Sequence, residues 1–256
     1  MHQSTKIDNA ISDFTRAVLP KFMQRLGSAI LFTVTTQKPR THGPAIDDLF
    51  AVTRKTPEPI RDGVVLLPAF ADSGALLRRI ERLIRVSPLR RMFTPGGRLM
   101  QVEMSNCGAF GWISEPSGYR YRRRDPLTGK PWPAMPGAFR ALARRAAESA
   151  GFSGFDPDVC LLNRYTPGTG LSPHRDLDEA DRCWPIVSVS LGLSATFMLY
   201  GNQRGGTPQL IALHDGDVLV FGGPARLAYH GVKKLAAGHH PLTGACRYNL
   251  TFRRAR

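Results

Sequence analysis

Residues 186–200 read IVSVSLGLSATFMLY and fall into two short apolar runs, 186–193 and 195–200, with Ser194 between them. Similar runs, separated by Gly, Pro and Asp, recur along the second half of the chain. Short strands at close, regular spacing are typical of sandwiches and jelly rolls rather than of βαβ units. This half of the chain therefore predicts a double-sheet β core. Its expected strands are residues 159–165, 186–193, 195–200, 209–213, 217–221, 226–229 and 247–253.

Two helices are expected outside this core. Residues 72–85 follow a short strand at residues 63–67, and their apolar side chains recur at helical spacing, with Asp72 and Ser73 as candidate caps. Residues 136–150 carry a second apolar helical face. That face consists of Phe139, Leu142 and Ala146. We therefore expect an α+β, mainly β fold, in which N-terminal helices flank a jelly-roll core.

The first 50 residues differ in composition from the rest. They include TTQKPRTHGP at residues 35–44, and a segment so rich in Thr, Pro and Gly is poor at forming a core. We expect a loosely ordered tail over residues 1–50 and one folded domain over residues 51–256. An organelle-targeting peptide, or a start codon assigned too far upstream, would produce the same pattern.

The chain is strongly basic, with 35 Lys and Arg against 20 Asp and Glu and a formal charge of +15. Such a surface attracts polyanions, so nucleic acid is the favoured partner, although charge alone would also suit anionic lipid or an indifferent basic surface. No apolar run approaches the roughly 20 residues that cross a bilayer. The four cysteines form no C-x-x-C pair, which disfavours a zinc knuckle and a disulfide framework. We expect a soluble, cytoplasmic protein.

A candidate metal site begins with His174 and Asp176, which lie two residues apart and would share one face of an extended segment. Alone, this pair is equally compatible with a turn histidine beside a capping aspartate. His230, far downstream, completes a set of two histidines and one carboxylate, which suits nonhaem Fe(II) with open positions. The pattern predicts an iron site with room for a bidentate 2-oxo acid and O₂.

The C-terminal run at residues 247–253 alternates with a period of two. Its polar face consists of Arg247, Asn249, Thr251 and Arg253. Two guanidiniums and an amide are costly to bury without an anionic partner, and a dicarboxylate matches the fork of an arginine. The alternative is a solvated basic edge strand. Asn163 and Tyr165 share a strand face in the same way and would offer an amide and a phenol to the same acid.

These motifs occur together, in one order, in a chain that resembles the AlkB family of oxidative nucleic-acid demethylases, most closely its bacterial members. The resemblance covers about residues 60–254. It rests on NRYTPG (163–168), SPHRDLD (172–178), PIVSVSLG (185–192), GDV (216–218), YHG (229–231), HPLT (240–243) and RYNLTFR (247–253). It also includes TPGG (94–97), NCG (106–108), GW (111–112) and PWPAMP (131–136).

The resemblance implies a double-stranded β-helix (jelly-roll) core with a nucleotide-recognition lid at about residues 85–135. The residues that would hold Fe(II) are His174, Asp176 and His230. The residues that would bind 2-oxoglutarate are Asn163, Tyr165, Arg247, Asn249 and Arg253, with Arg247 favoured for the distal carboxylate. The residues that would face the damaged nucleotide are Trp112, Tyr119, Tyr121, Asp178 and Arg204.

Two features depart from the family pattern. Phe221 stands where a larger aromatic is expected, and the run Arg122-Arg123-Arg124 is unusually basic. Both affect the shape of the pocket or the affinity for a strand more than the chemistry.

The function implied by the resemblance is direct-reversal DNA repair by a dioxygenase. Alkyl groups of the 1-methyladenine and 3-methylcytosine type would be oxidised in single-stranded or locally melted DNA, with RNA as a further substrate, releasing formaldehyde, succinate and CO₂. The base would have to be flipped out or already unpaired to reach the iron. We expect a monomer. The alternatives are a 2-oxoglutarate-dependent oxygenase that acts on protein side chains, which would need no basic and aromatic groove, and a non-catalytic nucleic-acid binder.

Overall fold

The computed structural model describes residues 56–256, so the tail expected at residues 1–50 lies outside the described residues. The helices are α3 (Ser73–Val86), α4 (Gly137–Ser149) and the short 3-10 turn η1 (Gly223–Ala225). The strands of the first half are β1 (Glu58–Arg61), β2 (Val64–Leu67), β3 (Glu103–Gly108), β4 (Gly111–Glu115) and β5 (Gly118–Arg122). Those of the second half are β6 (Val159–Tyr165), β7 (Leu171–His174), β8 (Ile186–Gly192), β9 (Ala195–Leu199), β10 (Gln209–Leu213), β11 (Val218–Phe221), β12 (His230–Val232) and β13 (Arg247–Arg253).

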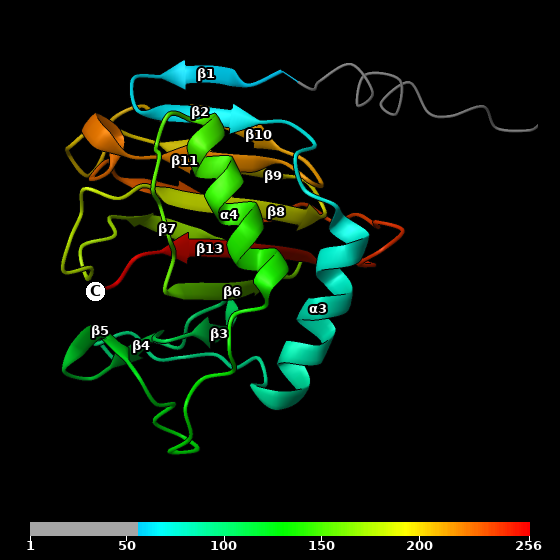
Figure 1. The fold of residues 1–256 in the computed structure, drawn as a ribbon, viewed down its shortest axis with the longest axis vertical. Coiled ribbons are helices and arrows are strands. Elements are labelled where there is room, and N and C mark those ends of the chain that lie inside the picture. The colour runs from blue at the N-terminus through cyan, green and yellow to red at the C-terminus, as the bar shows by residue number, and fades with distance from the viewer. Residues whose placement is uncertain (1–55) are drawn as a thin grey trace, which may run out of the picture. The chain divides into compact units, whose positions relative to one another are not determined.

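The strands form two antiparallel sheets and a separate hairpin. The large sheet has seven strands in the order β1-β2-β11-β8-β13-β6-β3, and the small sheet has four in the order β10-β9-β12-β7. Strands β4 and β5 pair only with each other (Figure 1). Strands that are distant in sequence lie side by side in both sheets, as in a jelly roll. The predicted mainly β fold with a jelly-roll core is confirmed.

The core has two layers, one on each face of the large sheet. Side chains from both sheets form one buried cluster, which includes Ile186 and Leu219 from the large sheet and Phe197 and Ile211 from the small one. The opposite face of the large sheet packs against α3 and α4 (Figure 1). In β8, Val187, Val189 and Leu191 face the helices. Because strand side chains alternate, the residues between them are turned toward the small sheet.

Both predicted helices are present close to their expected bounds. Helix α3 begins after Asp72, whose side chain accepts a hydrogen bond from the backbone N–H of Ala75 at 2.9 Å, so Asp72 is the N-cap. Helix α4 follows Pro136 and buries the expected face of Phe139, Leu142 and Ala146. No helix among residues 56–256 is long and apolar enough to span a membrane.

The predicted strands agree with the structure except at residues 226–229, where the expectation was wrong. The chain there leaves η1 in a tight turn, in which Arg226 N–H donates to the carbonyl of Gly223 and Ala228 N–H to that of Ala225. Proline at position 224 favours this turn. Strand β12 begins only at His230, which was expected at the end of a strand and instead opens one.

The region at residues 85–135, expected to be a lid, has two parts. Strand β3 pairs with β6 and forms an edge of the large sheet. The hairpin formed by β4 and β5 is a separate two-stranded unit, and we call it the lid hairpin.

Candidate metal centre and the polar face beside it

The three candidate metal ligands meet at the junction of β7 and β12. His174 ends β7, His230 begins β12, and the two residues pair in register across these antiparallel strands. Nε2 of His174 lies 3.8 Å from Oδ1 of Asp176, and Nε2 of His230 lies 3.8 Å from Oδ2. One donor atom from each residue lies within 4.8 Å of the other two, so the three side chains suit a single ion.

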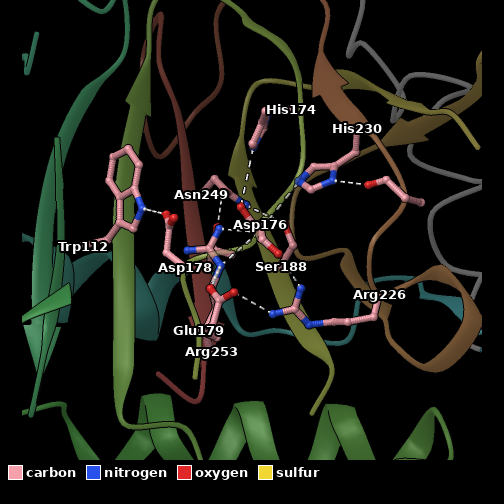
Figure 2. A network of polar contacts seen from close by, with 12 residues as sticks. Trp112, His174, Asp176, Asp178, Glu179, Ser188, Arg226, His230, Asn249 and Arg253 are labelled. Atoms are coloured by element: carbon pink, nitrogen blue, oxygen red, sulfur yellow. Dashed lines mark hydrogen bonds and ion pairs between the residues drawn. The ribbon is translucent and has the colours of Figure 1, made fainter. Parts of the chain in front are cut away.

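Backbone contacts prepare both histidines to act as ligands. Nδ1 of His174 lies 3.0 Å from the carbonyl oxygen of Ser172, and Nδ1 of His230 lies 3.0 Å from that of Ala228. A carbonyl oxygen can only accept, so each Nδ1 carries the proton and donates it. The lone pair of each ring is then on Nε2, which is directed toward Asp176 (Figure 2).

The carboxylate of Asp176 is held by an arginine. Arg253 donates to Oδ2 of Asp176 through Nε at 3.0 Å and Nη2 at 2.7 Å. Burial by itself would raise the pKa of Asp176, but the charge of Arg253, assisted by the two histidines, outweighs it and keeps the pKa below its ordinary value. Asp176 is therefore ionised and can ligate a cation near neutral pH.

His230 lies against aromatic rings. Phe197 stacks on its imidazole at a centroid distance of 5.5 Å, and Phe221 meets it edge-on at 5.0 Å. Burial is the main cause that lowers the pKa of His230 to about 4, with the neighbouring His174 as the second cause. A neutral imidazole is the form that ligates a metal, so this environment keeps His230 ready to bind.

Beside the triad, β13 and β6 present a buried polar face. Arg247 pairs in register with Tyr165, and Asn249 with Asn163, so four of the five side chains expected to bind one co-substrate face one another on two adjoining strands. Strand β13 is central, between β8 and β6, and Arg247, Asn249, Thr251 and Arg253 are all buried. The alternative of a solvated basic edge strand is excluded by this position.

This polar face has hydrogen-bonding capacity left over. Nη2 of Arg247 donates to Ser190 at 2.9 Å, but its Nε and Nη1 are buried without a partner, as is Oδ1 of Asn163. Arg247 is only 1% exposed, and a guanidinium so buried needs an anion. A carboxylate of 2-oxoglutarate would supply the acceptors that the protein does not, so the residues fit this co-substrate.

The two arginines of the face differ in their partners. Arg253 is already engaged by the carboxylate of Asp176 and lies 3.5 Å from Glu179, whereas Arg247 forms no ion pair among the described residues. Arg247 is instead positioned by Ser190 and by the ring of Tyr165. Arg247 has two buried donors without a partner, Nε and Nη1, whereas Arg253 has one, Nη1, and this difference favours Arg247 for the distal carboxylate.

The lid hairpin contributes aromatic and acidic side chains. Trp112 on β4 stacks on Tyr119 of β5 with ring centroids 5.2 Å apart and planes 19° apart. The indole N–H of Trp112 donates to Oδ2 of Asp178 at 2.8 Å (Figure 2). Burial raises the pKa of Asp178 above its ordinary value. These three residues, all expected to face a nucleotide, lie together, and Asp178 is two residues beyond Asp176.

The remaining expected residues are placed differently. Tyr121 is only 7% exposed and donates its hydroxyl to Glu179. Arg204 is exposed in the loop between β9 and β10, outside the network around Asp176. In the basic run, Arg122 pairs with Glu115, Arg123 lies over the ring of Phe110, and Arg124 donates to the carbonyl of Gly129.

Several site residues were not anticipated. Ser188 and Ser190 on β8 hydrogen-bond to Asn249 and Arg247, and the sequence signal was present, since two serines at alternate positions interrupt an otherwise apolar strand. Glu179 and Arg226 form a buried ion pair at 2.9 Å. No local pattern marks Arg226, because its partner is distant in sequence.

Comparison with known proteins gives consistent results. The sequence profile of the 2OG-Fe(II) oxygenase superfamily matches residues 63–253. The chain is 52% identical over 210 residues to the alpha-ketoglutarate-dependent dioxygenase AlkB of Escherichia coli strain K12, covering 81% of this chain and 97% of that protein. It is 32% identical over 228 residues to the DNA N(6)-methyladenine demethylase ALKBH1D of Arabidopsis thaliana, covering 76% of this chain and 50% of that protein.

A solved structure agrees with these matches. The structure of OsALKBH1 superimposes with a TM-score of 0.68 at 30% identity, covering 77% of this chain and 99% of that one. The profile match, the identity to E. coli AlkB and the shared fold lead to one conclusion: this chain belongs to the AlkB family of Fe(II)- and 2-oxoglutarate-dependent dioxygenases.

Proposed function

We propose that the protein removes alkyl groups of the 1-methyladenine and 3-methylcytosine type from bases in single-stranded or locally melted DNA, with RNA as a further substrate. The observation that carries this proposal is the His174, Asp176 and His230 set beside the buried, incompletely paired Arg247. A relative at 32% identity is named as a demethylase of a base in DNA, which supports the substrate class.

In this proposal, His174, Asp176 and His230 hold Fe(II), while Arg247, Tyr165, Asn163, Asn249 and Arg253 surround 2-oxoglutarate. The iron, when bound with 2-oxoglutarate and O₂, supplies the oxidation of the alkyl C–H bond, and the co-substrate leaves as succinate and CO₂. The oxidised methyl group departs as formaldehyde, which restores the base. The protein holds and orients the reactants.

The lid hairpin suits a flipped base. Trp112 offers an aromatic face already oriented by Tyr119 and Asp178, and a base can stack on such a face. The carboxyl group of Asp178 lies beside the indole, where it can meet an exocyclic amino group of the base. An alkylated base loses part of its pairing, so the cost of flipping it is smaller than for an intact base.

The basic run at residues 122–124 would contact phosphates of the strand that carries the flipped base. Phosphate contacts position a strand without reading its sequence. Arg204, exposed beyond β9, is proposed as a further contact to the nucleotide.

We further propose that the catalytic unit spans residues 51–256, with a lid within about residues 85–135 and a dispensable tail at residues 1–50. We propose that it acts as a monomer in DNA repair in the cytoplasm. A reducing compartment suits both Fe(II) and the four cysteines, which are all free.

An oxygenase for protein side chains would need the same iron and 2-oxoglutarate residues, but it would have no use for a stacked Trp–Tyr hairpin bordered by arginines. The named relatives also do not favour it. The two substrate classes can be separated by one comparison of oligonucleotides with peptides.

The test uses the full chain with Fe(II), 2-oxoglutarate, ascorbate and O₂. Oligonucleotides that carry one 1-methyladenine or one 3-methylcytosine are incubated with this mixture, and their masses are then measured by mass spectrometry. We expect loss of one methylene unit of mass, dependent on 2-oxoglutarate and absent in Asp176→Ala. Unchanged oligonucleotides in the presence of peptide-dependent succinate formation would contradict the proposal.

A further inference from the structure

The lid hairpin touches the metal-ligand segment at two adjacent residues. Trp112 on β4 donates to Asp178 at 2.8 Å, and Tyr121 on β5 donates to Glu179 at 2.6 Å. Asp178 and Glu179 follow Asp176 at two and three residues, with the exposed Leu177 between. The docked hairpin is therefore hydrogen-bonded to the segment that carries the candidate ligand Asp176.

The contact of Tyr121 is buried and chemically well defined. Its side chain packs with Phe110, Val159 and Ala255 and is itself buried. Burial raises the pKa of Tyr121 well above its ordinary value, so the hydroxyl keeps its proton and acts as a donor. The only role of this hydroxyl among the described residues is the bond to Oε1 of Glu179.

Glu179 connects Tyr121 to Asp176 through two arginines. Its Oε2 accepts from Nη2 of Arg226 at 2.9 Å, and its Oε1 lies 3.5 Å from Nε of Arg253. Arg253 in turn donates twice to Asp176, and Nη1 of Arg226 donates to the backbone carbonyl of Asp176 at 3.0 Å. A continuous buried chain of contacts therefore runs from the hydroxyl of Tyr121 to the carboxylate of Asp176, and Figure 2 shows its part from Glu179 onward.

The geometry points to Tyr121 and Glu179 as positioning residues that couple docking of the lid hairpin to the orientation of Asp176. With the hairpin docked, Tyr121 holds Glu179, Glu179 holds both arginines, and Arg253 holds Asp176 in its ligating orientation. With the hairpin detached, the buried charges lose one of their hydrogen-bond partners. Coupling of this kind is reciprocal, so metal binding must also favour the docked hairpin. The inference rests on the proposed function only for the identity of the metal.

The test compares Tyr121→Phe with Tyr119→Phe in the full chain. Both variants remove one phenolic hydroxyl from the same face of β5, but only Tyr121 takes part in the chain to Asp176. Anaerobic titration with Fe(II), and with Mn(II) as a redox-stable probe, measures metal affinity. Partners that orient metal ligands affect metal affinity by about 10- to 100-fold. Tyr121 lies two contacts beyond Arg253, which is the partner of Asp176, so a smaller effect is expected. We expect a loss of about threefold to tenfold for Tyr121→Phe and none for Tyr119→Phe.

Hydrogen exchange of residues 111–122 supplies a readout that needs neither activity nor substrate. In the wild type and in Tyr119→Phe, addition of Mn(II) should slow the exchange of the hairpin amides. In Tyr121→Phe, the exchange should be about tenfold faster and should no longer respond to metal, because the link between hairpin and Asp176 is broken. Unchanged metal affinity and an intact response to Mn(II) in Tyr121→Phe would overturn the inference.

Glu179→Gln provides a second variant. It keeps the size of the side chain and an acceptor for Tyr121 but removes the charge between Arg226 and Arg253. We expect weaker metal binding than in Tyr121→Phe while the hairpin stays docked, and wild-type affinity would contradict the chain of contacts. These measurements use no methylated substrate. Their outcome is therefore separate from whether oligonucleotides are demethylated.

Discussion

Arg247 and Tyr165 are direct neighbours across two strands, and the guanidinium carbon of Arg247 lies 5.0 Å from the centre of the Tyr165 ring. The ring covers one side of the guanidinium and Ser190 occupies one of its nitrogens, so the direction of the remaining N–H groups is set before any ligand arrives. A preorganised donor pair of this kind loses little freedom on binding an anion.

Arg247→Lys should weaken 2-oxoglutarate binding by about tenfold to a hundredfold, since a single ammonium cannot replace a fork of donors and hydrogen bonds to charged groups contribute about 1.5–3 kcal/mol. Arg164→Lys is the matched control, because Arg164 lies on the same strand pair but bonds to Glu103 instead. The dissociation constant is measured anaerobically with Mn(II) in place of Fe(II). Equal affinity in both variants would remove Arg247 from the co-substrate site.

His174→Ala, Asp176→Ala and His230→Ala should each abolish formaldehyde release and metal binding while the fold persists. His239→Ala is the control, since His239 is exposed and outside the cluster. Circular dichroism checks the fold, and metal titration checks the site. Near-normal turnover in any one of the three would exclude that residue from the ligand set.

The polar face of β13 and the closeness of His174 and Asp176 in the candidate triad were predictable from sequence, because alternation with a period of two and the spacing of these two residues are local signals. The packing of those residues was not. Asp176 lies in the segment that follows β7 of the small sheet, and it bonds to Arg253 but not to Arg247. This difference depends on how that segment lies against β13, which is a long-range property. From the sequence, Arg247 could only be favoured over Arg253 for the distal carboxylate. Their different hydrogen-bond partners now distinguish the two arginines.

The error at residues 226–229 has a related cause. The composition of those residues is apolar enough for a strand, but Arg226 is buried in an ion pair with Glu179. The turn after η1 directs the side chain of Arg226 toward Glu179. The short strands β4 and β5 were also missed, because GWISE and GYRYR carry too few apolar residues for a clear alternation. Both misses fall where the β4–β5 hairpin and the residues around Glu179 meet, and there tertiary contacts outweigh local preference.

The stability of the metal-free protein should decrease as the pH falls through a window set by His230. Its pKa in the folded protein is about 4, below the 6.5 of an ordinary histidine, so the unfolded chain takes up the proton first as the pH falls. The stability linked to neutral His230 is therefore present above about pH 6.5 and is lost between about pH 6.5 and pH 4. For this buried group the difference amounts to about 3 kcal/mol of unfolding free energy.

Urea unfolding with chelator present, at pH 7 and pH 4, measures this effect. Between pH 7 and pH 4, the unfolding free energy of His230→Gln should fall by about 3 kcal/mol less than that of the wild type. The unfolding free energy of His239→Gln should fall as much as that of the wild type. Identical losses in the wild type and in His230→Gln would show that burial does not shift this histidine.

Deletion of residues 1–50 should leave demethylation of a short oligonucleotide nearly unchanged. The family profile begins to match only at residue 63, and residues 35–44 lack the apolar pattern of a core-forming segment. The assay compares kcat/KM of the truncated and full chains on one methylated single strand. Loss of most of the activity in a folded truncation would make the tail part of the catalytic unit.

Phosphate contacts and base recognition should depend on different residues of the hairpin region. Replacement of Arg122, Arg123 and Arg124 by Gln should weaken binding to every single strand and flatten its salt dependence, by about one unit of log-log slope for each phosphate that is no longer neutralised. Preference for a methylated strand should remain. Arg122 already forms an ion pair with Glu115, so it neutralises a phosphate less fully, and the three replacements need not lower the slope equally.

Trp112→Ala should have the opposite effect. The indole lies between Tyr119 and Asp178, which orient it for stacking, and removal of an aromatic platform costs about 1–3 kcal/mol per stacked base without altering any phosphate contact. The salt slope should therefore stay at the wild-type value while the preference for the methylated strand disappears. Titration of methylated and unmethylated strands over a range of salt, without O₂, measures both quantities. A wild-type slope in the triple variant would make the basic run a solvated loop. Full methyl preference in Trp112→Ala would mean that the indole packs the lid and does not read the base.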